Sequence, residues 1–122
     1  MKLDIDAVSQ VLAAEPGVLL AALFGSSREG NVREGSDVDI GVLLSPAPSP
    51  MEFYEFYQRV AARLSHVAEL DLVDLLRADS VLAFEALCGR RLVVRNPEAV
   101  ATFVSEVARQ YEDDMLHAAA SA

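Results

Sequence analysis

The sequence holds very little cysteine, and this narrows its possible chemistry. One cysteine, Cys88, occurs in 122 residues, so an internal disulfide cannot form. With two isolated histidines and no paired Cys and His positions, nothing indicates a zinc site. Cys88 follows the apolar segment 81–87, and free cysteine is among the residue types most often buried. We therefore expect it to be a small buried residue.

Basic residues are scarce too. The chain carries 10 Lys and Arg against 19 Asp and Glu, a formal net charge of −9 at pH 7. Binding to nucleic-acid phosphates depends on Lys and Arg, so this balance argues against direct, sequence-independent binding of nucleic acid. It suits a basic protein partner instead. Part of the acidity can also belong to metal ligands.

Long apolar runs are missing as well. No segment approaches the roughly 20 apolar residues that span a bilayer, so we expect no membrane association. Residues 1–10 carry acids where a secretory signal peptide carries basic residues, which favours a cytoplasmic protein. The length of 122 residues and the hydrophobic fraction of 52% predict one domain, residues 1–122, with a packed core.

Short apolar and amphipathic segments alternate along the chain. Apolar residues at steps of three and four indicate helices, and short apolar or alternating runs indicate strands. We expect helices at 5–14, 51–64, 80–88 and from 96–97 to about 117, and strands at 18–24, 38–44, 69–75 and 91–94. This order predicts an α/β fold, a small mixed β-sheet of about four strands with helices mainly on one face.

The most informative segment joins the first two predicted strands. It reads Gly25-Ser26, then ten residues, then Asp37-x-Asp39. Side chains alternate along a strand, so Asp37, Asp39 and Gly41 should share the face that the helices leave open. Two carboxylates placed in this way repel each other unless a cation lies between them, and their oxygens suit Mg²⁺. Gly41 would leave room there for a substrate.

The first half of this segment has the character of a phosphate-binding turn. Gly25 allows a close approach of backbone to ligand. Ser26 and Ser27 are residue types that begin a short helical turn, whose N–H groups can bind an anion. We expect Gly25, Ser26, Ser27 and Arg28 to bind the phosphates of a nucleotide, although Arg28 could equally be a solvated loop charge. For Arg33 the solvated position is favoured.

A third carboxylate is expected on the third strand, at Asp71 or Asp74. The apolar positions Leu70 and Leu72 should face the helices, which leaves Asp71 on the same open face as Asp37 and Asp39. Asp74 falls on the other face and should be solvent-exposed or cap a turn. We therefore favour Asp71 over Asp74 as the third carboxylate of the site.

Together these residues resemble the nucleotidyltransferase signature of the DNA polymerase beta superfamily. Over nearly its whole length the chain resembles the minimal nucleotidyltransferases, the MNT-domain antitoxin family. The resemblance rests on Gly25-Ser26, Asp37-x-Asp39, the 70–75 strand (LDLVDL) and the 89–93 segment (GRRLV). A minor departure is Cys88, at a position where this family commonly has an acid.

The resemblance implies a function as well as a fold. MNT proteins commonly pair with HEPN-domain ribonuclease toxins, as the antitoxin that transfers AMP from ATP to a tyrosine of the toxin. It implies that Gly25 and Ser26 bind the triphosphate, that Asp37 and Asp39 bind Mg²⁺, and that Asp71 binds metal and activates the hydroxyl. The protein would then be a protein adenylyltransferase (AMP transfer with release of pyrophosphate) that works in a hetero-oligomer.

Two other functions stay open. The chain could be a nucleotidyltransferase for a small hydroxylated molecule such as an aminoglycoside, or a non-catalytic antitoxin that neutralises its toxin by contact alone. Arg90 and Arg91, at the start of the last strand, could contact a partner or could be ordinary hydrophilic residues.

Overall fold

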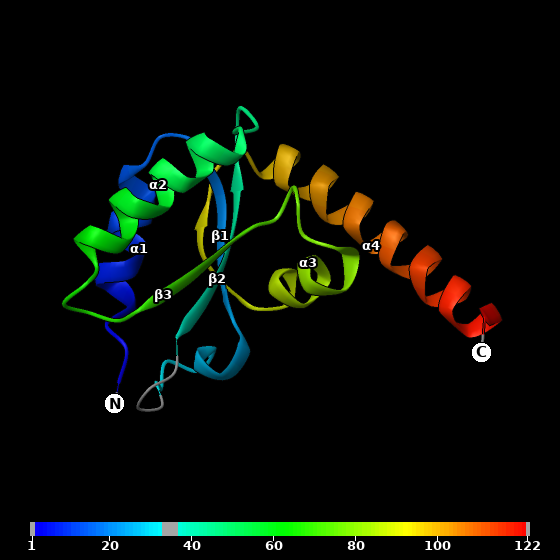
Figure 1. Cartoon of the computed structure of the whole chain (residues 1–122), viewed down its shortest axis with the longest axis horizontal. Helices are drawn as coiled ribbons and strands as arrows, with labels where there is room; N and C mark the ends of the chain where they lie inside the picture. Colours follow the sequence, from blue (N-terminus) through cyan, green and yellow to red (C-terminus); the bar gives the residue numbers. More distant parts are fainter. Residues whose placement is uncertain (1, 33–36, 122) are drawn as a thin grey trace.

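The computed structural model describes residues 2–32 and 37–121 of the chain (Figure 1). The helices are α1 (Ile5–Ala14), α2 (Pro50–Arg63), α3 (Ser80–Leu87) and α4 (Pro97–Ser121), with a short 3₁₀ helix, η1 (Gly25–Ser27). The strands are β1 (Val18–Phe24), β2 (Val38–Leu44), β3 (Leu70–Asp74) and β4 (Arg90–Val94). The predicted order of elements is confirmed. The largest difference is at the end of α4, which continues past the predicted end near residue 117.

The four strands form one mixed sheet in the order β3-β2-β1-β4. β1 pairs antiparallel with β2 and with β4, while β2 and β3 run parallel. In this register Phe24, at the end of β1, lies opposite Asp39 of β2, and Asp39 lies opposite Asp71 of β3. The end of β1 and the beginnings of β2 and β3 therefore lie side by side, at the same end of the sheet.

Helices cover both faces of the sheet, and this differs from the expected arrangement of helices mainly on one face. α1 and α2 pack over a core that contains Leu12, Ile40 and Val60. α3 and the first part of α4 pack on the opposite face over a second core, which includes Leu43 and Val100. Both faces of β1 and β2 are apolar away from the carboxylates, so both need a helical cover.

Local sequence signals fix where the helices begin. At the start of α1, Asp4 accepts a hydrogen bond from the N–H of Ala7. At the start of α3, Asp79 accepts one from the N–H of Leu82. At α2, Ser49 and Glu52 form a reciprocal capping box. Asn96 accepts a bond from the third residue after it at α4. Each of these four helices therefore begins at a polar residue whose side chain accepts a hydrogen bond from its first turn.

The second half of α4 extends away from the rest of the molecule. Val100 and Val107 are buried, whereas residues 112–120 are all exposed. Figure 1 shows this end of α4 running outward from the sheet. In the described part of the chain no helix combines the length and apolar character needed to cross a bilayer.

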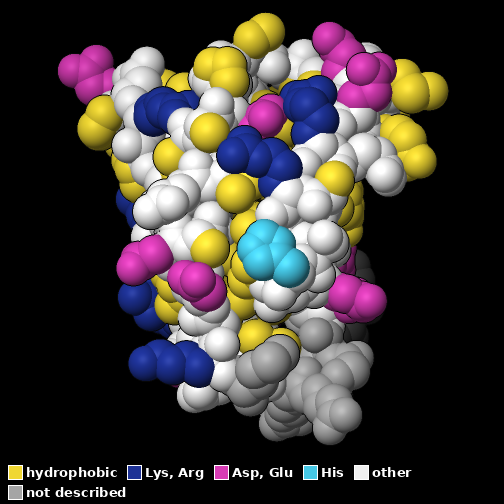
Figure 2. Space-filling view, turned by 90° about the vertical axis from the view of Figure 1, so that its left-hand side faces the viewer, with side chains coloured by type: hydrophobic (Ala, Val, Ile, Leu, Met, Phe, Trp, Pro, Cys, Tyr) yellow, Lys and Arg dark blue, Asp and Glu magenta, His cyan; other side chains and the backbone are white. Residues whose placement is uncertain are grey.

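Figure 2 shows the side of the molecule on which α1 and α2 lie. Basic and acidic side chains are interspersed there among scattered hydrophobic ones, in the part of that face that the structure describes. Opposite charges mixed in this way form no continuous basic stripe of the kind that follows a nucleic-acid backbone.

Candidate active site

The two strands β2 and β3 bring carboxylates together. Asp39 and Asp71 are direct partners in the parallel pairing of these strands. Burial raises the pKa of Asp39 above its ordinary value, and Asp71 raises it further through its negative charge and a hydrogen bond. The charges of Asp37 and of Glu85, on α3, act in the same direction. The structure thus gathers the three predicted acids and adds a fourth, Glu85, which sequence reasoning missed.

Gly25 joins the two halves of the motif in space. Its backbone has a φ of 72°, a conformation that favours glycine. A Cβ at this position would lie 2.5 Å from Oδ2 of Asp39. The backbone of the Gly-Ser turn therefore lies directly against a carboxylate of the acid cluster, and no other residue type would leave this space free.

The turn after β1 begins earlier than predicted, and this changes which side chains are exposed. η1 starts at Gly25, and the N–H of Arg28 donates to the Gly25 carbonyl at 3.2 Å. Ser26 and Arg28 are exposed. Ser27 is only 1% exposed, and its hydroxyl has no hydrogen-bond partner among the described residues. The Ser27 side chain is buried here, so a phosphate contact of this residue would have to use its backbone N–H rather than its hydroxyl.

Asp74 has a structural role. It is buried on the face opposite Asp71, as the alternation predicted, and it accepts a hydrogen bond from the N–H of Leu76 at 3.1 Å. Arg77 forms an ion pair with it at 2.7 Å and also donates to the carbonyl of Pro48. The expected solvent exposure of Asp74 is therefore wrong, whereas its capping of the turn is confirmed.

Gly41 makes room for a helix. A Cβ there would lie 2.8 Å from Leu75 and 2.9 Å from Ala86 of α3. The prediction that Gly41 leaves space for substrate is therefore wrong. Its small size instead lets α3 approach β2 closely, and this approach carries Glu85 toward the acid cluster.

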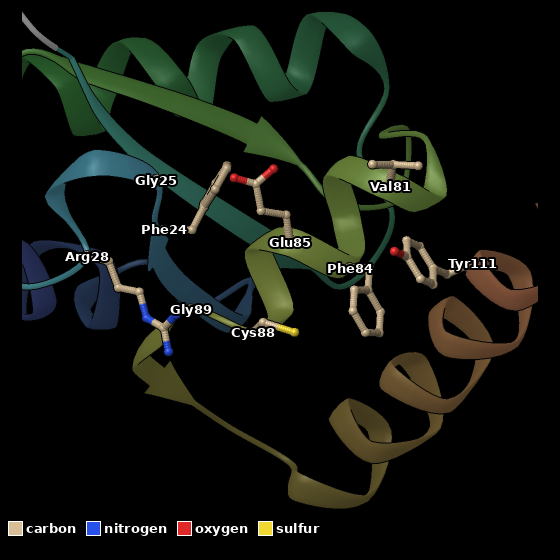
Figure 3. Close-up of a pocket in the computed structure, with 9 residues that line it drawn as sticks. All are labelled: Phe24, Gly25, Arg28, Val81, Phe84, Glu85, Cys88, Gly89 and Tyr111. Atoms are coloured by element: carbon tan, nitrogen blue, oxygen red, sulfur yellow. The ribbon is translucent and has the colours of Figure 1, made fainter. Parts of the chain in front are cut away.

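A hollow of about 500 Å³ lies beside the acid cluster, between η1, α3 and α4 (Figure 3). Arg28 lines one side of it, and Phe84 and Tyr111 line another, while the carboxylate of Glu85 points toward Phe24. Cys88 also lines it and is exposed, so the prediction of a buried cysteine is wrong. The reason is that α3 ends at residue 87, so Cys88 occupies the C-cap at the mouth of the hollow.

Other basic residues named from the sequence are less informative. Arg90 and Arg91 are exposed at the start of β4, where they pair with β1. Arg90 borders a separate hollow together with Lys2 and Asp4. Arg33 lies outside the described residues.

The donor set fits a hard divalent cation. Burial and, after it, the negative charges at the start of β2 raise the pKa of Asp39, and a cation would relieve the repulsion between these charges. Within residues 2–32 and 37–121, no three Asp, Glu, His or Cys side chains form a ready-made metal cage. Mg²⁺ does not require one, because it is usually held by one or two carboxylates, waters and substrate phosphates.

Comparison with known proteins places this chain in a family. The family model "Polymerase beta, Nucleotidyltransferase" matches residues 6–99, more than half of the chain. The curated protein adenylyltransferase MntA of Shewanella oneidensis is 37% identical over 78 residues, which cover 63% of this chain and 55% of that protein. The match thus spans about half the length of this curated relative.

Solved structures agree with the family match over nearly the whole chain. A crystal structure of a mutant toxin–antitoxin complex containing MntA aligns with a TM-score of 0.79 and 25% identity. It covers 97% of this chain and 94% of that one. A toxin–antitoxin crystal structure with AMP-PNP aligns with a TM-score of 0.78 and 26% identity, over the same shares of each chain. The chain belongs to the polymerase beta nucleotidyltransferase family.

Proposed function

We propose that this chain transfers AMP from ATP to a hydroxyl group of a partner protein, as the antitoxin of a toxin–antitoxin pair. The observation that carries the proposal is the contact between the motif halves: the Gly25 backbone lies against Asp39, and Asp39 lies opposite Asp71. The relatives support it, because one is a protein adenylyltransferase and two are toxin–antitoxin structures.

In this proposal, different residues of the site would bind the phosphates and the metal ion. Gly25 and Ser26 would hold the phosphates, with exposed Arg28 beside them. Asp37, Asp39 and Asp71 would hold Mg²⁺. When bound, Mg²⁺ would neutralise charge on the phosphates and on the attacking and leaving oxygens.

In this proposal Asp71 would act as the general base. It is exposed, and β3 is an edge strand of the sheet, so a hydroxyl group can approach it from outside the molecule. Asp71 would take the proton of that hydroxyl. The hydroxyl oxygen bonds to the α-phosphorus, and the bond from that phosphorus to the pyrophosphate oxygen breaks.

A HEPN ribonuclease toxin is the partner that we propose, with a tyrosine as the acceptor, in the cytoplasm. The net charge of −9 suits a basic partner that binds RNA. An acceptor supplied by the partner agrees with the open position of Asp71 at the sheet edge.

The test is the intact mass of the partner after incubation with this chain, ATP and Mg²⁺. Each transfer should add about 329 Da, and Asp39→Asn should abolish the gain because it removes a charge from the cluster. The matched control is Asp6→Asn on α1, an exposed acid outside the site, which should keep the gain.

Two outcomes would overturn the proposal. If the wild-type chain forms a stable complex with the toxin and neutralises it without any mass gain, the chain is a contact-only antitoxin. If it adenylylates an aminoglycoside without a partner and leaves the toxin unmodified, its acceptor is a small molecule.

A further inference from the structure

We propose that the hollow between η1, α3 and α4 binds the nucleoside of the substrate nucleotide, with the base stacked against the Phe84–Tyr111 pair. This inference rests on the proposed nucleotidyl transfer and names the part of the chain that would recognise the base. The motif residues account for phosphates and metal only, so the base and ribose still need a place.

The hollow is continuous with the phosphate turn. Gly25 lies against Asp39 and also lines the hollow, and Arg28 lines it as well. Figure 3 shows Gly25 and Arg28 on one side, with α3 on the other. A nucleotide whose phosphates lie at Gly25 can therefore extend its nucleoside into this space without crossing the protein.

The order of the strands separates this hollow from the acceptor side. Asp71 lies on β3, at one edge of the sheet, and the hollow begins at the end of β1, two strands away. The attacking hydroxyl has to come to the Asp71 side. The Gly25 side is then left for the nucleotide.

The walls of the hollow match a flat aromatic base. The rings of Phe84 and Tyr111 are stacked, with centroids 4.2 Å apart and an angle of 12° between their planes. They come from α3 and α4 and so brace each other. Val81 is 47% exposed on the same wall, an apolar surface that the core does not cover. Aromatic side chains stack on every nucleobase with little preference for one base over another, so this wall would accept a purine.

The size and polarity of the hollow also suit a nucleoside. The volume of about 500 Å³ falls within the range that small-molecule sites usually occupy, roughly 300–1,000 Å³. Glu85 also lines the hollow, and a carboxylate can accept hydrogen bonds from the ribose hydroxyls or from an amino group of the base.

Cys88 provides a direct probe of occupancy, because it is the single cysteine, it is exposed and it lines the hollow. Its alkylation by iodoacetamide should slow at least fivefold with ATP and Mg²⁺, and likewise with AMP-PNP. Inorganic tripolyphosphate, which lacks the nucleoside, should leave the rate unchanged. The control is Ala62→Cys in a Cys88→Ser background, an exposed site on α2, whose labelling should not respond to ATP.

A substitution in the wall tests the stacking itself. Phe84→Leu should raise the KM for ATP about tenfold and leave kcat within about twofold, since base stacking is lost and the phosphate turn is kept. Phe103→Leu is the matched control, because Phe103 packs in the same core without lining the hollow. It should lose similar stability and keep the KM.

The outcomes separate this inference from the proposed function. Equal labelling of Cys88 with and without ATP, in a preparation that transfers AMP, overturns the nucleoside site and leaves the function standing. Protection by tripolyphosphate as strong as that by ATP also overturns it. Protection by ATP without any mass gain on the partner supports the nucleoside site and counts against the proposed function.

Discussion

The substitution Gly25→Ala tests how tightly the two halves of the motif are joined. Gly25 has a φ of 72°, and alanine in this conformation costs about 1–2 kcal/mol. The new Cβ would lie 2.5 Å from Oδ2 of Asp39, so the carboxylate would have to move by about 1 Å to reach an ordinary contact.

The expected effect on activity is much larger than the effect on stability. A displacement of about 1 Å in a reacting group can cost about 100-fold in rate, so kcat/KM for AMP transfer should fall by about that factor. The free energy of unfolding, measured by urea denaturation, should fall by only about 1–2 kcal/mol. Activity is assayed at a temperature where the variant is fully folded.

Gly30→Ala is the matched control. Gly30 also has a positive φ, 90°, but among the described residues a Cβ there would meet Ile5 alone, at 3.3 Å. It should show a similar stability loss with a transfer rate within about twofold of wild type. If Gly25→Ala folds and transfers AMP at the wild-type rate, or if both variants lose activity equally, the contact with Asp39 does not position the site.

Three further predictions concern charges. Asp39→Asn should raise the free energy of unfolding of the free chain at pH 7 by about 1 kcal/mol, an amount typical of like-charge repulsion near a surface. Because the pKa of Asp39 is raised in the folded state, its ionisation opposes folding as the pH rises, so the gain should disappear below about pH 4; a gain that persists there would contradict this. Asp74→Ala should cost about 1–3 kcal/mol, because it removes a buried ion-pair partner of Arg77 and a turn bond, and should leave the KM for ATP unchanged in folded protein. EDTA should abolish AMP transfer and added Mg²⁺ should restore it, and transfer that continues in excess EDTA would exclude a required divalent ion.

Much of the fold could be predicted because its signals are local. Strand alternation in LDLVDL places Asp71 and Asp74 on opposite faces, and the structure has them there. The helices predicted from residues 80 and 96–97 begin there because Asp79 and Asn96 cap them through residues only three positions away, a signal that lies within a short stretch of sequence. The meeting of Asp39 with Asp71 needed only the assumption that their strands are neighbours.

Some of the failed predictions involve contacts between distant elements, and others involve the exact bounds of a short helix. The small size of Gly41 was assigned to substrate, because the sequence does not show that Ala86 of α3 packs there. Ser27 turned inward because η1 begins at Gly25, a shift in the 3₁₀ turn too small for residue preferences to detect. The stack of Phe84 on Tyr111 joins two helices and has no signal in either one alone.

Unfavourable features of this structure gather at the candidate site. Gly25 holds a φ that other residues avoid, and Asp39 is a carboxylate whose ionisation is disfavoured. Both lie at the end of the sheet where β1 ends and β2 begins. Crowded charge and constrained backbone lower the stability of the free chain. Proteins retain such features mainly at sites where the binding of a ligand compensates for the lost stability. A nucleotide with its cation would do so here, which is why binding of AMP-PNP with Mg²⁺ should raise the unfolding temperature of the wild-type chain more than that of Asp39→Asn.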